Sequence, residues 1–153
     1  MRSWRFLAGA AATAIALTLG ACGSDDDAEG TDAGAVEAAV DASGRGVGGM
    51  RRGGNSGGLA ISKPLRETTE KDWDLQHDVM AKGSFLVSKA AARALIEQGL
   101  GGDIVYISSK NSVFAGPNNI AYSATKADQA PPVRSLAVEP GQHGVRVHGI
   151  HPD

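Results

Sequence analysis

Three residues in the stretch 104–126 have the types and spacing to do chemistry. Tyr122 and Lys126 stand four residues apart, and Ser109 precedes the tyrosine by thirteen residues. A spacing of four places two side chains on the same face of a helix. An ammonium group near a phenol favours the phenolate, so the pair could act as a general acid or base. A serine facing them could hold a substrate oxygen, although exposed helices also carry this Tyr–Lys spacing without any chemistry.

The neighbouring sequence predicts the elements that would position these residues. Residues 104–107 (Ile-Val-Tyr-Ile) form a short apolar, β-branched run, which is typical of a buried strand. The run ends at the polar pair before Lys110, and a loop containing Gly116 and Pro117 follows. A helix should then begin near Tyr122. A strand end and a helix start would thus face each other, which suits proton transfer at a carbonyl or alcohol oxygen.

Ser109, Tyr122 and Lys126 resemble the signature of the short-chain dehydrogenases/reductases, a serine followed thirteen residues later by Tyr-x-x-x-Lys. The resemblance covers about residues 55–153. It implies a Rossmann-type α/β fold and hydride transfer between NAD or NADP and a small-molecule alcohol or carbonyl substrate. It also implies that Tyr122 is the acid/base, that Ser109 holds the substrate oxygen, and that Lys126 contacts the nicotinamide ribose.

The same resemblance implies contacts with the cofactor. The segment Asn55-Ser-Gly-Gly58 stands where the family has Asn-Asn-Ala-Gly, and Pro152 stands where a Pro-Gly would contact the nicotinamide. The predicted cofactor-binding residues are Asn55, Gly58, Tyr122, Lys126 and Pro152. The family's Gly-rich phosphate turn, the first strand before it and the acidic residue that contacts the ribose are all expected to be missing. We therefore expect the catalytic residues to identify the family more securely than they predict activity.

The sequence differs from the usual family pattern at positions that bear on the substrate and on the proton path. The Ser-Ser-Lys-Asn run at 108–111 and the ending Pro152-Asp153 are similar to the dehydrogenase half of bifunctional rhamnulose-phosphate aldolase/dehydrogenases. That similarity implies a small hydroxy-aldehyde or sugar-derived substrate. Met80 stands where the family often carries an asparagine that relays protons, and a thioether cannot relay a proton.

The start of the chain has the pattern of a bacterial lipoprotein signal peptide. Arg2 and Arg5 precede an uncharged run over residues 6–21, and Leu-Gly-Ala-Cys at 19–22 resembles a lipobox with Cys22 as the lipid-anchored residue. A transmembrane anchor or a misread internal start remain alternatives. The pattern predicts an exported, membrane-anchored protein, whereas the family resemblance favours the cytoplasm, where nicotinamide cofactors are found. The sequence does not decide between them.

Residues 23–54 are predicted to be a linker or a degraded first half. Residues 44–58 are rich in Gly and Arg and are expected to be disordered. The run Met50-Arg-Arg-Gly-Gly54 is poorly suited to a buried central strand, because arginine is costly to bury and glycine weakens a strand. The fold class is therefore α/β, a fragment of a Rossmann-type parallel sheet with flanking helices in residues 55–153. A signal-like segment, residues 1–22, and the Gly-rich stretch precede it.

A long helix is expected from about residue 70 to residue 97. Thr69 and Asp72 resemble a capping box at its start. Five residues should share one apolar stripe along it: Val79, Gly83, Leu86, Ala90 and Ala94. Such a stripe could pack on the sheet, or form a homo-oligomer as the family does. Further along the chain, Pro131-Pro132 should interrupt the helix that carries Lys126, and residues 145–150 should form the next strand.

Composition narrows the possible functions. The chain has 153 residues, a net charge of −2 and no basic stripe, so nucleic acid is not an expected partner. A single cysteine excludes an intrachain disulfide framework. His148 and His151 stand three residues apart, but no acidic or cysteine partner completes a metal-ligand pattern, so a metal is not expected. The prediction is an NAD(P)-dependent oxidoreductase that is shorter than a complete family member. The alternatives are a non-catalytic, lipid-anchored exported protein carrying a dehydrogenase remnant, or an interaction module that pairs through residues 79–94.

Overall fold

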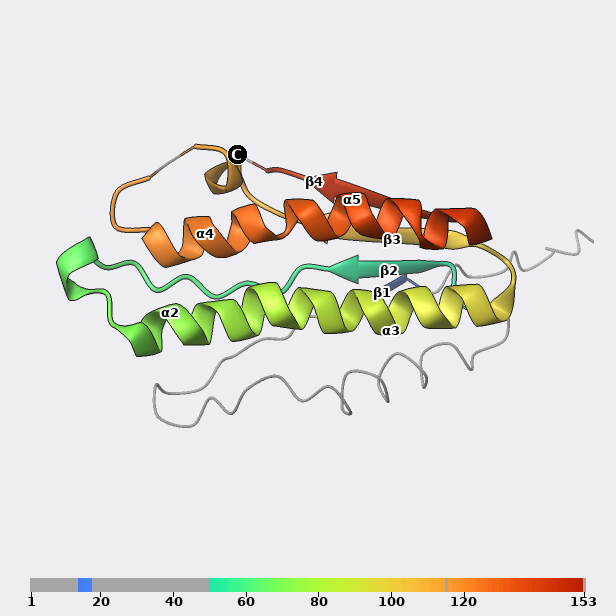
Figure 1. Ribbon diagram of the computed structural model, residues 1–153, viewed down its shortest axis with the longest axis horizontal. Coiled ribbons are helices and arrows are strands. Elements are labelled where there is room, and N and C mark those ends of the chain that lie inside the picture. Colours follow the sequence, from blue (N-terminus) through green and yellow to red (C-terminus); the bar gives the residue numbers. More distant parts are fainter. Residues whose placement is uncertain (1–13, 18–49, 115, 153) are drawn as a thin grey trace, which may run out of the picture.

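The computed structural model describes residues 14–17, 50–114 and 116–152. Its elements are, in chain order, β1 (Ala14–Leu17), β2 (Arg52–Asn55), α2 (Glu70–Gln76), a π-helical turn (His77–Lys82), α3 (Gly83–Gln98), β3 (Gly102–Ile107), α4 (Ile120–Asp128), α5 (Ala130–Val138) and β4 (Val145–Ile150) (Figure 1). Short 3-10 turns cover Leu65–Glu67, Lys110–Ser112 and Pro140–His143.

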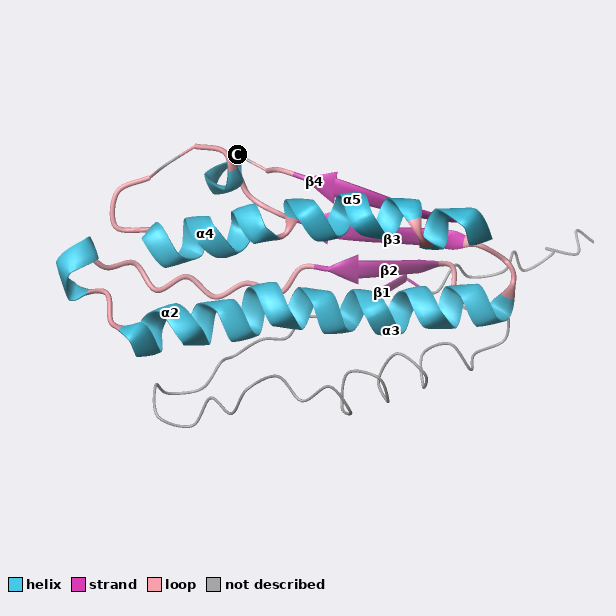
Figure 2. Cartoon of the chain, in the orientation of Figure 1, coloured by secondary structure: helices cyan, strands magenta, loops and turns pink. Residues whose placement is uncertain are grey.

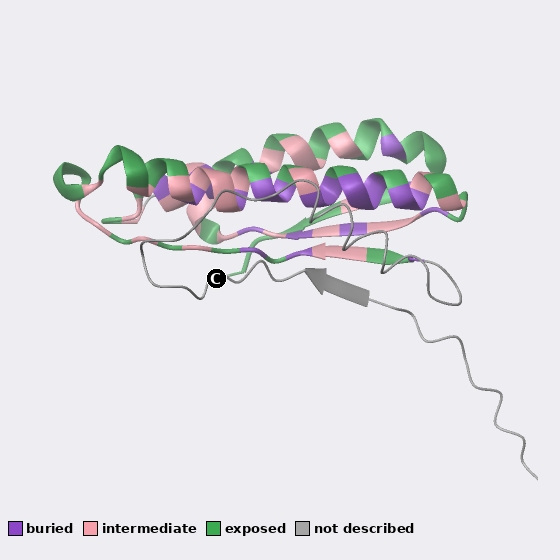
Figure 3. Ribbon diagram, turned by 90° about the horizontal axis from the view of Figure 1, so that it is seen from below, coloured by how far each residue is buried: buried purple, intermediate pink, exposed green. Residues whose placement is uncertain are grey.

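The four strands form one parallel sheet in the order β1-β2-β3-β4. Asn55 pairs with Tyr106 and Ile107 with Ile150, so the carboxyl ends of the last three strands lie near one another. Two helical rows, α2–α3 and α4–α5, run beside each other along the strands (Figure 2) and cover the same face of the sheet (Figure 3). The predicted α/β class with a parallel sheet and flanking helices is confirmed.

The Arg- and Gly-rich run forms an inner strand, so the expectation of a disordered stretch is wrong for residues 52–55. Arg52 is exposed, and its Nε lies 3.8 Å from a carboxylate oxygen of Asp103 on β3. Gly53 faces α3, where an added Cβ would lie 3.3 Å from the Ala91 Cβ. The strand is tolerated because its charge stays in solvent and its glycine lets the helix come close. Residues 44–49 lie outside the described part of the chain.

The strand β1 lies within the predicted signal run, residues 6–21, and pairs in parallel with β2. The expectation that no strand precedes β2 was therefore wrong. Cys22 and the segment that follows it lie outside the described residues. Within the part of the chain that the structure describes, no helix combines the length and apolar character needed to cross a membrane.

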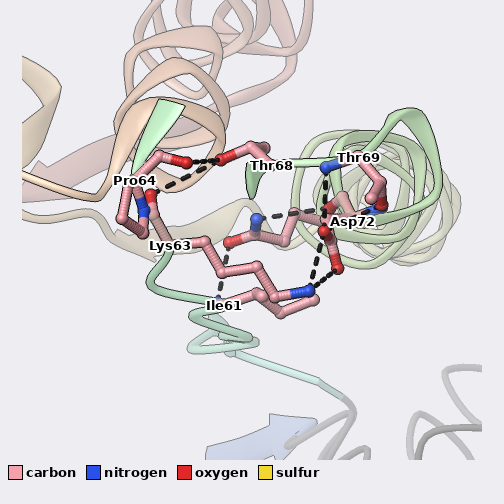
Figure 4. A network of polar contacts seen from close by, with 7 residues as sticks. Ile61, Lys63, Pro64, Thr68, Thr69 and Asp72 are labelled. Carbon is pink, nitrogen blue, oxygen red and sulfur yellow. Dashed lines mark hydrogen bonds and ion pairs between the residues drawn. The ribbon is translucent and has the colours of Figure 1, made fainter. Parts of the chain in front are cut away.

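The predicted capping box begins α2. The Asp72 side chain accepts hydrogen bonds from the Thr69 N–H at 2.9 Å and from the Lys63 ammonium at 2.8 Å (Figure 4). Lys63 first, and then Thr69, lower the pKa of Asp72 to about 2. Nearby, the Ile61 N–H donates to Oε1 of Gln76 at 3.1 Å. These bonds fasten the loop that follows β2 to the first turns of the helix.

The helix continues through the π-helical turn into α3 and ends at Gly99, whose φ of 65° is the left-handed conformation that favours glycine. Three residues of the predicted stripe, Gly83, Ala90 and Ala94, are buried, whereas the side chains of Val79 and Leu86 are half-buried at its edge. Small residues thus form the face of α3 that rests on the sheet.

The core lies between this face and the strands. Its fully buried members include Leu95 from α3, Ile104 and Tyr106 from β3, and Val145 from β4. Gly101, with a φ of 64°, leads into β3, and an added Cβ there would lie 2.6 Å from a backbone oxygen of the turn before β4. Only glycine fits this close approach, which holds the amino ends of β3 and β4 together.

The prolines divide the second helical row as predicted. The break falls at Gln129, and α5 begins directly after it with Pro131 and Pro132 in its first turn. First-turn N–H groups have no partner within a helix, so proline costs little there. The chain therefore re-enters a helix, α5, directly after the break.

Candidate active site

Ser109 follows the end of β3 in extended conformation. Its Oγ accepts a hydrogen bond from the Asn111 N–H at 3.2 Å, which caps the turn Lys110–Ser112. A serine hydroxyl can accept and donate at the same time. The O–H of Ser109 is therefore available to donate to a substrate oxygen while the turn fixes its position.

Lys126 is the most constrained of the predicted catalytic residues. It is only 4% exposed, and burial lowers the pKa of its ammonium. Nζ donates to the carbonyl oxygen of Ile107 at 3.2 Å and to Oε1 of Gln129 at 3.5 Å. An ammonium has three donors, so one remains after these two contacts. The lysine is thus fastened to the carboxyl end of β3, two residues before Ser109.

Tyr122 lies one turn before Lys126 on α4, as the sequence predicts. Lys126 Nζ lies 5.9 Å from the centre of the tyrosine ring, at the outer limit of a cation–π contact. The Tyr122 carbonyl accepts from the Thr125 hydroxyl at 2.8 Å, and that hydroxyl also lies 3.8 Å from the Met80 sulfur. Met80, which the family resemblance places at the position of a relay asparagine, is fully buried. The structure therefore brings the tyrosine and lysine together beside the end of β3.

A buried polar link behind the lysine was missed by the sequence analysis. Gln129 is 2% exposed, and its amide nitrogen donates to the Ser84 hydroxyl on α3 at 2.9 Å. Ser108 is also buried, and its hydroxyl donates to the Lys126 carbonyl at 3.3 Å. These contacts join both helical rows to the strand end. The available signal was a glutamine two residues before the proline pair, where an uninterrupted helix would continue.

The predicted cofactor residues have different surroundings. Asn55 ends β2 and is buried, and its Nδ2 has no hydrogen-bond partner among the described residues. Gly58 is exposed, and an added Cβ there would meet no atom within 4 Å. Pro152 is exposed, and its carbonyl accepts from the Lys110 N–H at 3.2 Å, beside Ser109. Asn55 and Pro152 thus lie at the carboxyl edge of the sheet, where open α/β sheets bind their ligands.

This arrangement can hold a polar ligand and move a proton. The free O–H of Ser109 can orient an oxygen, the Tyr122 phenol can exchange a proton with it, and the buried Lys126 supplies positive charge. The unpaired amide of Asn55 and the remaining donor of Lys126 are suited to the polar groups of a nucleotide. The described residues therefore fit a nicotinamide cofactor on the strand-end side. Residues 18–49, which follow β1, lie outside the described part of the chain.

A parallel sheet with serine, tyrosine and lysine at its carboxyl edge defines the class of dehydrogenases with a Tyr-x-x-x-Lys site. The family model described as Enoyl-(Acyl carrier protein) reductase matches residues 11–153. The chain belongs to the short-chain dehydrogenase/reductase family. The matched region begins before β1, so it includes part of the run that resembles a signal peptide.

The chain is also similar to individual oxidoreductases, which is consistent with this family. The uncharacterized oxidoreductase YuxG of Bacillus subtilis is 43% identical over 99 residues, which cover 65% of this chain and 14% of that protein. Carbonyl reductase [NADPH] 2 of Sus scrofa is 36% identical, over 64% of this chain and 40% of that protein. The crystal structure of carveol dehydrogenase from Mycobacterium avium, in complex with NAD, has 29% identity and a TM-score of 0.75, and the alignment covers 79% of this chain and 44% of that one. The chain thus spans less than half the length of each of these proteins.

Proposed function

We propose that the chain provides the catalytic part of an NAD(P)-dependent oxidoreductase that acts on an alcohol or carbonyl group of a small molecule. The observation that carries this proposal is the position of Lys126. Its ammonium is buried, bonded to the end of β3 and held 5.9 Å from the Tyr122 ring. Burying an ammonium is costly, and a purely structural role would be served equally well by an apolar side chain.

Each residue has a distinct task in this proposal. When bound, the nicotinamide cofactor supplies or accepts the hydride. Ser109 donates a hydrogen bond to the substrate oxygen, and Tyr122 gives a proton to that oxygen or takes one from it. Lys126 uses its remaining donor for a ribose hydroxyl and favours the phenolate of Tyr122 electrostatically. The Asn55 amide gains a partner when the nucleotide binds.

Direct cofactor binding tests the proposal. The full chain is titrated with NADH and with NADPH while the nicotinamide fluorescence is followed, and the better cofactor is then used with variants. Lys126→Met should weaken binding about tenfold or more, because it removes a charged donor from the ribose. Lys89→Met, an exposed lysine on α3, is the matched control and should bind normally. Tyr122→Phe should retain binding but lose turnover with small carbonyl substrates.

The outcomes separate binding from catalysis. Absence of binding by either cofactor at millimolar concentration would contradict the proposal. Binding that Lys126→Met leaves unchanged would show that the lysine does not contact the nucleotide. Equal turnover in the wild type and Tyr122→Phe would remove the tyrosine from the proton transfer.

The substrate class is also a proposal. The Bacillus subtilis relative is several times longer than the matched 99 residues, which make up only 14% of it. A protein of that length has room for a second domain. This supports the similarity to bifunctional rhamnulose-phosphate aldolase/dehydrogenases, and hence a small hydroxy-aldehyde or sugar-derived substrate. Lactaldehyde-sized hydroxy-aldehydes are therefore the first compounds to test for turnover.

Association through residues 70–97 is supported by two exposed aromatic side chains. Trp73 on α2 is 39% exposed and Phe85 on α3 is 51% exposed. Apolar side chains on a helix surface are suited to pairing with a second copy. Light scattering on the full chain should therefore give the mass of a dimer or a larger oligomer, and a monomer at micromolar concentration would contradict this.

A further inference from the structure

A cavity lies between α5 and the carboxyl ends of β3 and β4. Its volume is about 260 Å³, and its lining includes Tyr106 and Gly149 from the strands, Gln129, Val133 and Arg134 from the helical row, and His151 after β4. Tyr122 and Lys126 do not line it. Ligand pockets usually have volumes of about 300 to 1,000 Å³, so this cavity suits a small molecule.

Tyr106 lines the cavity and carries an unsatisfied hydroxyl. Tyr106 is 1% exposed, and its hydroxyl has no hydrogen-bond partner among the described residues. Burial raises the pKa of this phenol, and the neighbouring Ser88 hydroxyl on α3 opposes that rise. The Ser88 hydroxyl likewise has no other hydrogen-bond partner among the described residues. A phenol held neutral is a hydrogen-bond donor. Buried donors usually have a partner, so this hydroxyl is suited to bonding an acceptor that enters the cavity.

The lining also carries a positive charge and a histidine. Arg134 is exposed on α5 and forms no ion pair with any described residue. His151 Nδ1 lies 2.9 Å from the Ser112 hydroxyl and 3.3 Å from the Ser109 carbonyl oxygen. Its Nε2 lies 3.8 Å from the position that a Cβ on Gly149 would take, so this nitrogen faces the cavity.

The lining is complementary to an anion. No aspartate or glutamate is among the lining residues. Ala130 and Val133 supply apolar lining. A guanidinium matches the two oxygens of a carboxylate geometrically, and an apolar wall suits a short carbon chain.

We propose that this cavity binds a small organic carboxylate. The carboxylate is held at the mouth by Arg134, its carbon chain lies against Val133, and an oxygen of the ligand accepts the hydrogen bond of Tyr106. The ligand therefore lies next to the segment that carries Ser109. His151 links the two, because one ring nitrogen contacts the Ser109 carbonyl oxygen and the other faces the cavity. Binding requires neither a nicotinamide cofactor nor turnover, so it can be tested independently of the proposed activity.

The test uses butyrate and 3-hydroxybutyrate as probes, with 1-butanol as the neutral control at equal ionic strength. Nuclear magnetic resonance of the full chain follows the Gly149 amide and the Tyr106 ring during titration. Both carboxylates should shift these signals with saturation in the millimolar range, and 1-butanol should bind at least tenfold more weakly. 3-Hydroxybutyrate should bind more tightly than butyrate, because its hydroxyl can meet Tyr106.

Three variants locate the binding. Arg134→Gln should weaken butyrate binding about tenfold or more, and Gly149→Ala should weaken it similarly by placing a methyl group inside the cavity. That methyl group would lie 3.8 Å from His151 and 4.0 Å from Val133, both ordinary contact distances, so the fold should be preserved. Tyr106→Phe should remove the preference for 3-hydroxybutyrate. The matched controls are Arg51→Gln and Gly141→Ala, both at exposed positions.

Three results would overturn the proposal. The first is the absence of saturable shifts at Gly149 with either carboxylate. The second is equal binding of 1-butanol, which would show a merely apolar cavity. The third is unchanged binding in both Arg134→Gln and Gly149→Ala, which would place the carboxylate elsewhere on the protein.

Discussion

The neighbouring strands β2 and β3 are both inner strands of the sheet, but they pack against the helices in opposite ways. β3 places Ile104 and Tyr106 in the core, each 1% exposed. β2 places Gly53 there, and the Ala91 side chain of α3 comes within 3.3 Å of where its Cβ would be. One strand contributes side chains to the core, and the other contributes the space that a helix fills.

The loops after these strands differ in the kind of hydrogen bond that holds them. The loop after β2 is fastened by side chains, chiefly the Lys63 ammonium on Asp72 at 2.8 Å. The loop after β3 is fastened largely through the backbone, with the Ser108 N–H donating to Ile150 at 2.8 Å and the Lys110 N–H donating to Pro152 at 3.2 Å. Backbone bonds fix the position of Ser109 without depending on long side chains. Rigid backbone at the end of β3 is therefore the support of the candidate site.

The largest expected effect removes a side chain from β3. Ile104→Ala should reduce the free energy of unfolding by about 2 to 5 kcal/mol, because it removes buried methyl groups and leaves a cavity. Urea denaturation measures the change. Val113→Ala, at a position 74% exposed, is the control and should stay within about 0.5 kcal/mol of the wild type. A similarly small loss for Ile104→Ala would show that β3 does not supply the core.

The next effect adds a side chain to β2. Gly53→Val should destabilise the protein by about 1 to 3 kcal/mol, because its Cβ already lies closer to Ala91 than most real contacts allow. Gly58→Val, where an added Cβ meets no atom within 4 Å, should cost much less. Both are measured by urea denaturation. Equal losses at the two positions would mean that the close approach of α3 does not set the cost at Gly53.

The smallest effect concerns the charges that join the strands. Asp103 on β3 accepts from Arg146 on β4 at 2.8 and 3.1 Å and lies 3.8 Å from Arg52 on β2. Both arginines are exposed, so Asp103→Asn should cost about 0.5 to 1 kcal/mol near neutral pH and less in high salt. Asp74→Asn, at an exposed position on α2, is the control.

The effect of Asp103→Asn should also depend on pH. Hydrogen bonds from Arg146 hold the pKa of Asp103 below its ordinary value of 3.8. A lowered folded-state pKa means that the stabilisation is complete above 3.8 and is lost as the pH falls through the folded-state value. Stability curves of the two proteins should therefore converge in strong acid. A constant difference down to pH of about 2 would indicate packing and not charge.

The sequence predicts the parts of the fold that follow from apolar pattern and capping. The run at 104–107, the capping box at Thr69 and the break at the proline pair all occur as expected. The strand β2 could not be found in this way, because what stabilises it is the small face of α3, which lies far from it in the sequence. A rule that assigns buried strands by hydrophobicity fails where the neighbour supplies the hydrophobic atoms.

In the candidate site, too, the residues close together in sequence could be predicted and the long-range partners could not. Tyr122 and Lys126 are local in sequence, so helix geometry places them together. The Ile107 carbonyl and Gln129 complete the surroundings of the lysine, and the link from Gln129 to Ser84 spans 45 positions of the chain. Such long-range partners leave no periodic pattern. The unpaired hydroxyl of Tyr106 was equally hidden, because in sequence it is simply an aromatic residue of a strand.

The π-helical turn His77–Lys82 has a consequence for the phase of the helix that contains it. An α-helix advances about 100° per residue, so one additional residue in a turn rotates every later side chain by about that amount. Gln76 and Met80, before Gly83, and the small face of α3 after it are nevertheless all buried. The turn therefore works as a rotational adjustment between two helix segments that face different neighbours. An insertion or deletion of a single residue can be absorbed at this point and would be far more disruptive on either side of it.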